Sequence, residues 1–272
     1  MEENEFRFKK KFGQNFISDG NLINSIIEKA GITKTDTVLE IGPGAGAMTL
    51  ALAKAAARVV AVEIDRELEP LLEEKLAGIT NVDIIWGDVL KLQKDDLQKR
   101  IGGQFKLVAN LPYYITTPII FKFIEEDFDV SHIVVMVQKE VADRIVAAPK
   151  TKDYGILSVM LQSVGDVRII KTVDRKMFFP SPNVDSAIVR IDINKSKYAI
   201  MDKKCFREVV RNSFAWRRKT LANCLQMGFG FSKEETVGIL SKLKLDVNIR
   251  GEALDVPTFV EMANLVSKMK KK

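Results

Sequence analysis

The sequence has very few of the residues on which nucleophilic and metal-dependent catalysis depend. Its 272 residues include two cysteines and one histidine. Cys205 and Cys224 have no second Cys or His at the spacing of a metal-ligand pair, so we expect neither a metal site nor a disulfide framework. His132 precedes the apolar run 133–137 and is expected to begin a strand. With a single histidine, Ser-His-Asp and Cys-His chemistry lose their support.

Long hydrophobic runs are also missing. No segment approaches the roughly 18 consecutive apolar residues of a membrane span. The hydrophobic content of 46% is nevertheless enough for an ordinary packed interior. Glu2, Glu3 and Glu5 do not fit a signal or transit peptide. We therefore expect a cytoplasmic protein without a membrane partner.

Acidic residues are scarce in the last quarter of the chain. Residues 195–272 contain 17 Lys/Arg and 8 Asp/Glu, whereas residues 1–194 contain 25 and 28. Glu208 is the only acid between residues 203 and 233. A near-neutral region followed by a basic one indicates a small-molecule site beside a surface that binds a polyanion.

Short β-rich runs alternate with helical patterns from residue 20 to about residue 170. This alternation predicts an α/β fold with a parallel, doubly wound sheet, because parallel neighbours need crossover helices. Two further β-rich runs, 167–173 and 187–193, are expected to pair at the sheet edge. The expected parallel strands are 37–41, 58–64, 82–87, 105–110 and 132–138.

The pattern changes after the stretch NKSKYAIMD at 194–202. Everything beyond it is expected to be helical, over 203–227, 232–243 and 257–269. We therefore expect two domains, residues 1–196 and 197–272.

A glycine-rich segment, VLEIGPGAGAMT, lies between the first expected strand and its helix. Its glycines let the backbone turn tightly and approach a ligand, and the following helix offers free N–H groups at its positive end. Taken alone, such a turn would also serve a nicotinamide or flavin dinucleotide, or be only a tight turn. The acids Glu63 and Asp88, at the ends of the next two strands, discriminate between these possibilities. Glu63 is placed to accept hydrogen bonds from ribose hydroxyls and Asp88 from an adenine amine.

The spacing of these residues predicts one shared location. From Gly44 it is 19 residues to Glu63, a further 25 to Asp88 and a further 22 to Asn110, so each step is one βα unit. All four are expected at the carboxyl edge of the sheet, where open α/β sheets bind ligands. The combination ExGxGxG, then Glu, then Asp resembles the class I S-adenosylmethionine-dependent methyltransferases.

The motif NLPYY begins at Asn110. An adenine amine is a poor nucleophile because its lone pair is delocalised into the ring. If the Asn110 side-chain oxygen and the Leu111 carbonyl accept its two N–H bonds, the nitrogen becomes more tetrahedral and its lone pair can point at a methyl group. Pro112 keeps the turn rigid. Tyr113 can stack on an extruded base.

Six motifs in order resemble one family along nearly the whole chain. Besides NLPYY they are KKFGQNF (10–16), EIGPGAG, QKEVA (138–142), FFPSPNVDSA (178–187) and SFAWRRKTL (213–221). They are similar to the ribosomal RNA adenine N6,N6-dimethyltransferases, specifically the bacterial small-subunit branch. The resemblance implies a Rossmann-like, mostly parallel seven-stranded sheet with a small all-helical C-terminal domain. It also implies S-adenosylmethionine as cofactor and two adjacent adenosines near the 3′ end of 16S rRNA, in the 30S particle, as substrate, with a role in ribosome biogenesis and a monomeric enzyme.

The resemblance also assigns residue roles. Phe178, the first aromatic of FxPxPxV, would be a second stacking face, although Phe179 beside it is an alternative. Ile17 stands where the family usually has Leu, and its contact is expected through the backbone. The implied cofactor-binding residues are Asn15, Ile17, Gly42, Gly44, Glu63, Asp88 and Asn110. The implied catalytic residues are Asn110, Leu111, Pro112, Tyr113 and Phe178.

Basic side chains are expected to bind rRNA phosphates. Several recur at spacings of 3, 4 and 7, which places them on one face of the helix expected over 203–227. A second basic tract lies near the N-terminus. The expected RNA-binding residues are Lys204, Arg207, Arg211, Arg217, Arg218, Lys219, Lys9, Lys10 and Lys11.

Two other functions remain open from the sequence. A macrolide-resistance methyltransferase of large-subunit rRNA shares most of these motifs, but the helical C-terminal region and the form NLPYY favour the small-subunit branch. A non-catalytic RNA-binding assembly factor would keep the fold and lose motif residues. Glu63, Asp88, Asn110 and Tyr113 are all present, which argues against it.

Overall fold

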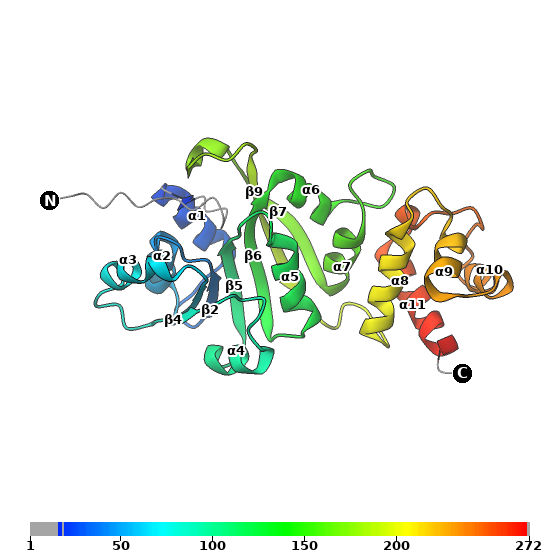
Figure 1. Cartoon of the computed structure of the whole chain (residues 1–272), viewed down its shortest axis with the longest axis horizontal. Coiled ribbons are helices and arrows are strands. Elements are labelled where there is room, and N and C mark those ends of the chain that lie inside the picture. Colours follow the sequence, from blue (N-terminus) through cyan, green and yellow to red (C-terminus); the bar gives the residue numbers. More distant parts are fainter. Residues whose placement is uncertain (1–15, 18, 271–272) are drawn as a thin grey trace. The chain divides into compact units, whose positions relative to one another are not determined.

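The computed structural model describes residues 16–17 and 19–270. A seven-stranded sheet with the order β4-β3-β2-β5-β6-β9-β7 is formed by strands between residues 37 and 193 (Figure 1). The five strands from β4 to β6 pair in parallel, whereas β9 pairs antiparallel with β6. The expected mostly parallel α/β fold is therefore confirmed. The strands are β1 Phe16–Ile17, β2 Thr37–Ile41, β3 Arg58–Glu63, β4 Val82–Trp86, β5 Phe105–Asn110, β6 Val130–Gln138, β7 Gly165–Val173, β8 Phe178–Phe179 and β9 Ser186–Ile193.

Helices join the parallel strands, as the crossover rule requires. The α-helices are α1 Gly20–Ala30, α2 Ala47–Ala55, α3 Glu69–Lys75, α4 Lys94–Ile101, α5 Thr116–Glu125, α6 Lys139–Val146, α7 Ile156–Val164, α8 Lys203–Ala215, α9 Leu221–Phe229, α10 Lys233–Lys242 and α11 Val256–Lys270. Short 3-10 turns occupy η2 Arg66–Leu68, η3 Arg175–Met177 and η4 Gly251–Ala253.

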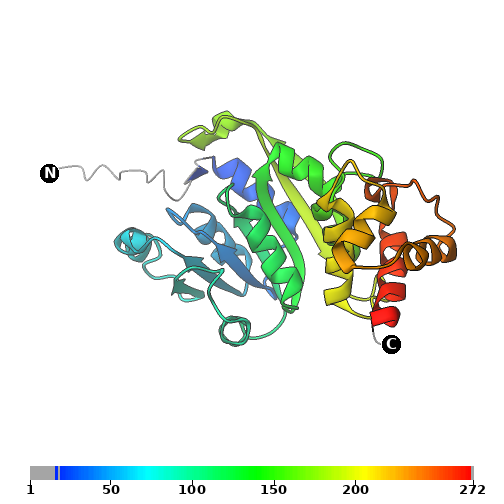
Figure 2. The same cartoon turned by 45° about the vertical axis from the view of Figure 1, so that its right-hand side comes forward.

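Both faces of the sheet are covered by helices, which explains why its central strands are continuous apolar runs. Val38 and Val108 are buried on one face with residues of α1 and α2. Phe105, on the other face of β5, meets Phe123 of α5 edge to face, with ring centroids 6.1 Å apart. Figure 2 shows α5 in front of the sheet. The sheet is thereby fixed between two helical layers, and its strand ends are left for function.

The helical segment after β3 begins at a capping residue. The side chain of Asp65 accepts a hydrogen bond from the Glu67 backbone N–H and begins η2, which continues into α3.

The last two strands of the sheet are neighbours, as predicted for the runs 167–173 and 187–193. Because β9 is antiparallel to β6, its first residue, Ser186, lies opposite Gln138 at the carboxyl end of β6. The β7–β9 connection, residues 174–185, is closed by Arg175, whose backbone N–H bonds Asp185 and whose guanidinium bonds the Asn183 carbonyl. This connection therefore lies at the same edge of the sheet as the ends of the parallel strands.

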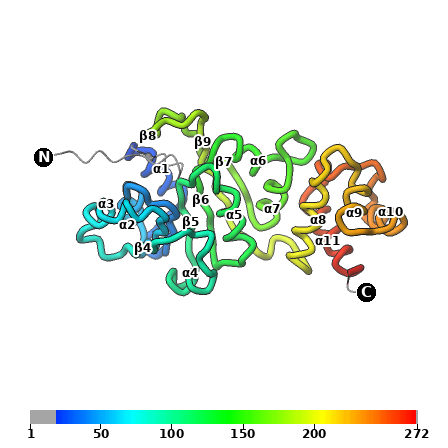
Figure 3. The backbone as a smooth tube through the Cα atoms, in the orientation of Figure 1, coloured from blue at the N-terminus to red at the C-terminus, as the bar shows by residue number. Residues whose placement is uncertain are grey.

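By its contacts the chain forms two compact units. One comprises residues up to Ala142 with Arg168–Ile193, and the other comprises Asp143–Val167 with the residues from Asn194 onward. The second unit therefore contains α7 as well as the C-terminal helices. Figure 3 shows the helices α8 to α11 as one group. The functional division at residue 196 is not tested by this grouping and stays a prediction.

The prediction of a single helix over 203–227 is wrong. α8 ends at Ala215, and α9 begins at Leu221 after the connection 216–220. Thr220 caps α9 by accepting a hydrogen bond from the Asn223 N–H, and the Leu221 N–H bonds the Ile249 carbonyl. A favourable N-cap and a tertiary bond thus outweigh the continuous apolar spacing. In the described part of the chain, no helix is both long and apolar enough to cross a membrane.

Candidate functional site

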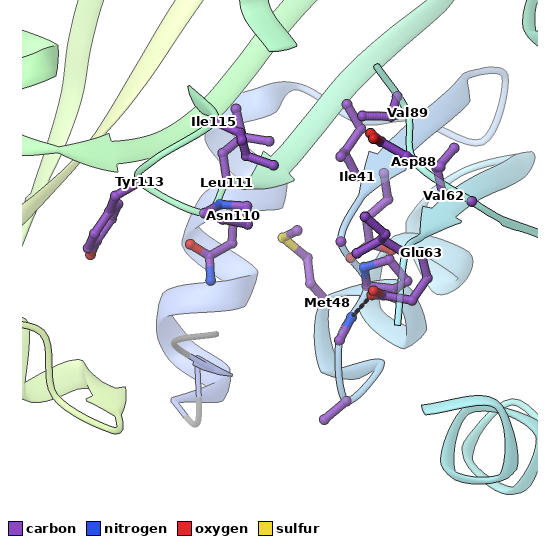
Figure 4. Close-up of a pocket in the computed structure, with 18 of the residues that line it drawn as sticks. Ile41, Met48, Val62, Glu63, Asp88, Val89, Asn110, Leu111, Tyr113 and Ile115 are labelled. Carbon is purple, nitrogen blue, oxygen red and sulfur yellow. Dashed lines mark hydrogen bonds between the residues drawn. The ribbon is translucent and has the colours of Figure 1, made fainter. Parts of the chain in front are cut away.

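A pocket opens at the carboxyl edge of the sheet, within the first unit. It is lined by the ends of β2, β3 and β5 and by the segments that follow them and β4. Figure 4 shows the Asn110 side chain between Tyr113 on one side and Met48, Glu63 and Asp88 on the other. The predicted site residues that line it are Gly42, Gly44, Glu63, Asp88, Asn110, Leu111, Pro112 and Tyr113. The expectation of one shared edge thus matches their observed positions.

The glycine-rich loop has a backbone that favours glycine. Gly42, Gly44 and Gly46 have φ values of 71°, 55° and 75°, in the left-handed region that L side chains rarely adopt. At Gly46 an added Cβ would also lie 2.9 Å from a methyl group of Leu72. The loop delivers the chain directly into α2, whose N-terminus faces the pocket through Ala47 and Met48. This arrangement provides unpaired N–H groups and a positive dipole end for a ligand.

Glu63 braces this loop. One carboxylate oxygen accepts a 3.1 Å hydrogen bond from the Gly44 N–H, drawn in Figure 4, and the other accepts a 2.8 Å bond from the Asp65 N–H. The side chain is 4% exposed, and burial raises its pKa despite these bonds. A carboxylate has about four acceptor positions, so Glu63 retains capacity for hydroxyl donors.

Glu40 is a second carboxyl group of the pocket wall and is completely buried. Alternation along β2 places it on the face that α2 covers. Burial, and to a smaller extent the charge of Glu63, raises the pKa of Glu40 from 4.5 to about 8, whereas the nearby Thr49 hydroxyl lowers it in part. Among the described residues, neither oxygen of Glu40 forms a hydrogen bond of good geometry. The protonated form of Glu40 is therefore favoured at neutral pH.

Asp88 follows β4 at the far side of the pocket. One of its carboxylate oxygens accepts a 3.0 Å bond from the Leu90 N–H, and the other lies 3.8 Å from the Lys91 ammonium. The side chain is 27% exposed. It can therefore still accept a hydrogen bond from a ligand amine.

The segment 110–115 is held rigidly. The Leu111 N–H points back to the Met136 carbonyl at 3.4 Å, and Leu111 is buried. The Pro112 carbonyl accepts bonds from the Ile115 N–H at 3.1 Å and from the Thr116 hydroxyl at 3.2 Å. Pro112 thus closes a turn that leads into α5.

Tyr113 is oriented by a residue that the sequence did not single out. Its hydroxyl lies 2.8 Å from the hydroxyl of Ser186, the buried first residue of β9. Burial raises the pKa of Tyr113, so the phenol is neutral. The ring is therefore fixed beside Asn110 by a hydrogen bond across the edge of the sheet.

Comparison with known proteins places this site. Residues 5–267 match the model of the family described as ribosomal RNA adenine dimethylase. The ribosomal RNA small subunit methyltransferase A of Clostridioides difficile (strain 630) is 45% identical over 271 residues, 98% of this chain and 93% of that protein. Its counterpart from Bacillus mycoides (strain KBAB4) is 47% identical over 271 residues, 97% of this chain and 93% of that protein. The chain belongs to the ribosomal RNA adenine dimethylase family.

Solved structures agree with this membership. A dimethyladenosine transferase from Plasmodium falciparum is similar with a TM-score of 0.81 at 26% identity, over 94% of this chain and 98% of that one. The 23S rRNA methyltransferase ErmE is similar with a TM-score of 0.69 at 25% identity, over 93% of this chain and 100% of that one. The expected fold and enzyme class, an rRNA adenine dimethyltransferase, are confirmed.

The two candidate stacking residues of this dimethylase differ in exposure. Phe178 is 4% exposed and belongs to the buried cluster between the sheet and α1, whereas Phe179 is 61% exposed. Neither ring is among the described residues that line the pocket. The assignment of Phe178 as a second stacking face stays a prediction.

Some expected residues lie outside the described part of the dimethylase. Asn15, Lys9, Lys10 and Lys11 are among them. Ile17 belongs to β1, and its backbone pairs with that of Phe178 in β8. The role of β1 in holding a cofactor therefore stays a prediction.

The expected RNA-binding residues of the C-terminal region do not share one helix face. Lys204, Arg207 and Arg211 belong to α8, whereas the cluster 217–219 lies in the connection between α8 and α9. The Arg217 guanidinium donates a 2.9 Å hydrogen bond to the Lys152 carbonyl, and Arg218 and Lys219 are exposed. The prediction of one continuous basic face from Lys204 to Arg218 is therefore wrong, because α8 ends at Ala215.

We predict that Ser186 sets the orientation of Tyr113 in catalysis. Both Ser186→Ala and Tyr113→Phe remove the same hydrogen bond, so each should lower kcat by about 3- to 10-fold, since such a bond contributes about 1 kcal/mol. The KM for the methyl donor should not change. The double variant should be no slower than either single variant, which a double-mutant cycle measures directly. Additive losses would mean that the two hydroxyl groups act separately.

Proposed function

We propose that this dimethylase transfers methyl groups from S-adenosylmethionine to the N6 amines of two adjacent adenosines in a hairpin loop near the 3′ end of 16S rRNA, within the 30S particle. The observation that carries this proposal is the pocket that gathers Glu63, Asp88, Asn110 and Tyr113 at one sheet edge. The relatives named for the small subunit are 45% and 47% identical to this chain, against 25% for ErmE. These identities favour the small subunit over the large one.

The pocket wall suits S-adenosylmethionine. Glu63 would accept bonds from ribose hydroxyls and Asp88 from the adenine amine, while Gly42 and Gly44 allow close approach of the backbone. The completely buried carboxyl group of Glu40 provides one further polar group in the wall. Asn15 and Ile17 are the remaining residues that we propose for cofactor binding. When bound, the cofactor supplies an electrophilic methyl group on a sulfonium centre.

Asn110 and Leu111 would prepare the target amine. The side-chain oxygen of Asn110 and the carbonyl of Leu111 accept hydrogen bonds from its two N–H groups, which localises the nitrogen lone pair for in-line attack. The turn closed by Pro112 keeps these acceptors in place before substrate arrives. Tyr113, held by Ser186, stacks on the extruded adenine. After the first transfer the methylated nitrogen loses one proton to water, and rotation of the amine presents its remaining N–H to the same acceptors.

The rRNA phosphates would be bound by the basic residues of the C-terminal region. Residues 1–196 would form the catalytic domain and residues 197–272 the RNA-binding domain, in a cytoplasmic monomer that acts during small-subunit biogenesis. The proposed RNA-binding residues are Lys204, Arg207, Arg211, Arg217, Arg218 and Lys219, together with Lys9, Lys10 and Lys11.

Charge reversal in this region should weaken RNA binding without affecting the cofactor. Arg218→Glu with Lys219→Glu alters two exposed side chains and should lower affinity for small subunits about 10-fold or more, because phosphate contacts are lost. The slope of log Kd against log salt should fall by about one for each contact. Lys34→Glu with Lys54→Glu is the matched control, because both lysines are exposed at the opposite end of the sheet from the pocket. An unchanged salt slope would contradict the assignment.

The proposed function is tested by methylation of unmethylated small subunits, with large subunits in parallel. Purified protein is incubated with labelled S-adenosylmethionine, and modified adenosines are mapped by mass spectrometry. Dimethyladenosine at two neighbouring positions of 16S rRNA is expected. Label only in 23S rRNA would assign the chain to the macrolide-resistance function. RNA binding without label would indicate a non-catalytic assembly factor.

A further inference from the structure

The two neighbouring tyrosines of NLPYY have opposite environments. Tyr113 is half-buried, and its hydroxyl is bonded to Ser186. Tyr114 is 59% exposed and lines the pocket beside it. Within the described residues, no hydrogen bond or ring contact is made by the Tyr114 side chain. The proposed reaction assigns a role to Tyr113 and none to Tyr114.

The backbone that carries Tyr114 is fixed although its ring is not covered. The Pro112 carbonyl bonds residues 115 and 116, on the far side of Tyr114, and α5 begins at Thr116. An aromatic ring on a rigid backbone loses little conformational entropy when it binds a planar partner. Because the ring of Tyr114 is exposed and lines the pocket, its face is available to a planar ligand there.

The chemistry of base extrusion defines that ligand. When an adenosine turns out of a stack into a pocket, the next base loses its stacking partner on one side. Aromatic side chains commonly replace such lost stacking in single-stranded RNA. The α-carbons of adjacent residues are about 3.8 Å apart, so Tyr114 lies one residue outward from the ring proposed to hold the extruded base.

We propose that Tyr114 stacks on the nucleotide next to the extruded adenosine. This inference rests on the proposed function, because it requires an RNA substrate whose target base leaves the stack. Since the two target adenosines are adjacent, one of them is a neighbour of the other whenever either occupies the pocket. In one of these two registers, the nucleotide that stacks on Tyr114 is the other target adenosine.

Three variants separate stacking from simple burial. Tyr114→Ala removes the ring, Tyr114→Leu keeps an apolar group without a flat face, and Tyr114→Phe keeps the face without the hydroxyl. Loss of one base stack weakens binding about 5- to 100-fold. We therefore expect the KM for small subunits to rise by this factor in the Ala and Leu variants and to remain near wild type in Phe. Thermal stability should not change, because the side chain is exposed.

The distribution of methyl groups between the two adenosines is a second measurement. It should not change if Tyr114 only supports the fold. In Tyr114→Ala, mass spectrometry should show a larger lag between modification of the first and of the second position. A wild-type KM and an unchanged lag in the Ala variant, with normal methylation by the wild type, would overturn this inference alone. Absence of small-subunit methylation by the wild type would overturn the proposed function, and this inference with it.

Discussion

Asn110→Ala should lower kcat for methyl transfer by about 10²- to 10³-fold, the usual loss when one fixed polar group at a reacting centre is removed. No histidine is among the described residues that line the pocket, so no imidazole can replace the acceptor at Asn110. The Kd for S-adenosylmethionine, measured by calorimetry, should change less than the rate, because Glu63 and Asp88 remain. Normal turnover by Asn110→Ala would refute the proposed mechanism.

Asn110→Asp provides the control for this prediction. Aspartate keeps an acceptor oxygen at the same place and loses the amide N–H₂ group. We expect it to retain more activity than alanine does. Equal losses in both variants would indicate that the amide donor, and not the oxygen, is the functional part of Asn110.

Glu40→Gln should change how the stability of the first unit depends on pH. Glu40 has a pKa raised from 4.5 to about 8 in the folded chain. Its contribution to folding is therefore fully present below about pH 4.5 and is lost as the pH rises through about 8. Over this range the wild type should lose up to about 1.4 kcal/mol of unfolding free energy per pH unit relative to Glu40→Gln. Above the folded pKa the difference should become constant.

Tryptophan fluorescence can follow this unit by itself. The chain has two tryptophans, and Trp86 lies in β4 of the first unit whereas Trp216 lies in the second. Urea unfolding in a Trp216→Phe background therefore reports the sheet. Glu73→Gln, which changes an exposed glutamate of α3, should follow the wild type at every pH. Parallel curves for Glu40→Gln and the wild type would contradict the neutral state of Glu40.

The parallel part of the fold could be predicted because its signals are local. The runs at 37–41 and 105–110 are strands with the expected bounds, since β-branched residues between glycine-rich or helical segments have few other conformations. The direction of β9 could not be predicted in this way, because an apolar run does not indicate whether a strand pairs parallel or antiparallel with its neighbour. The break at residues 216–220 was missed for a related reason: the bond from Leu221 to Ile249 is tertiary.

The candidate site could be predicted in part on the same grounds. Glu63, Asp88 and Asn110 follow strands at regular spacing, so their shared edge follows from the parallel order. The bond from Tyr113 to Ser186 joins residues 73 positions apart and requires the order of β6 and β9. Phe178 and Phe179 are adjacent in sequence, and only the packing around β8 decides which ring is buried.

The antiparallel direction of β9 brings a second stretch of chain to the edge of the sheet where the pocket lies. Apart from Asn110, the part of the pocket wall proposed for the cofactor is built by the first three parallel strands and the segments after them, all before residue 90. The opposite side is built by residues 110–115, and the hydroxyl of Tyr113 bonds that of Ser186, which follows the connection 174–185. If β9 ran parallel to β6, its first residue would lie at the other edge of the sheet. The hydroxyl that holds Tyr113 is therefore within reach only because β9 is antiparallel.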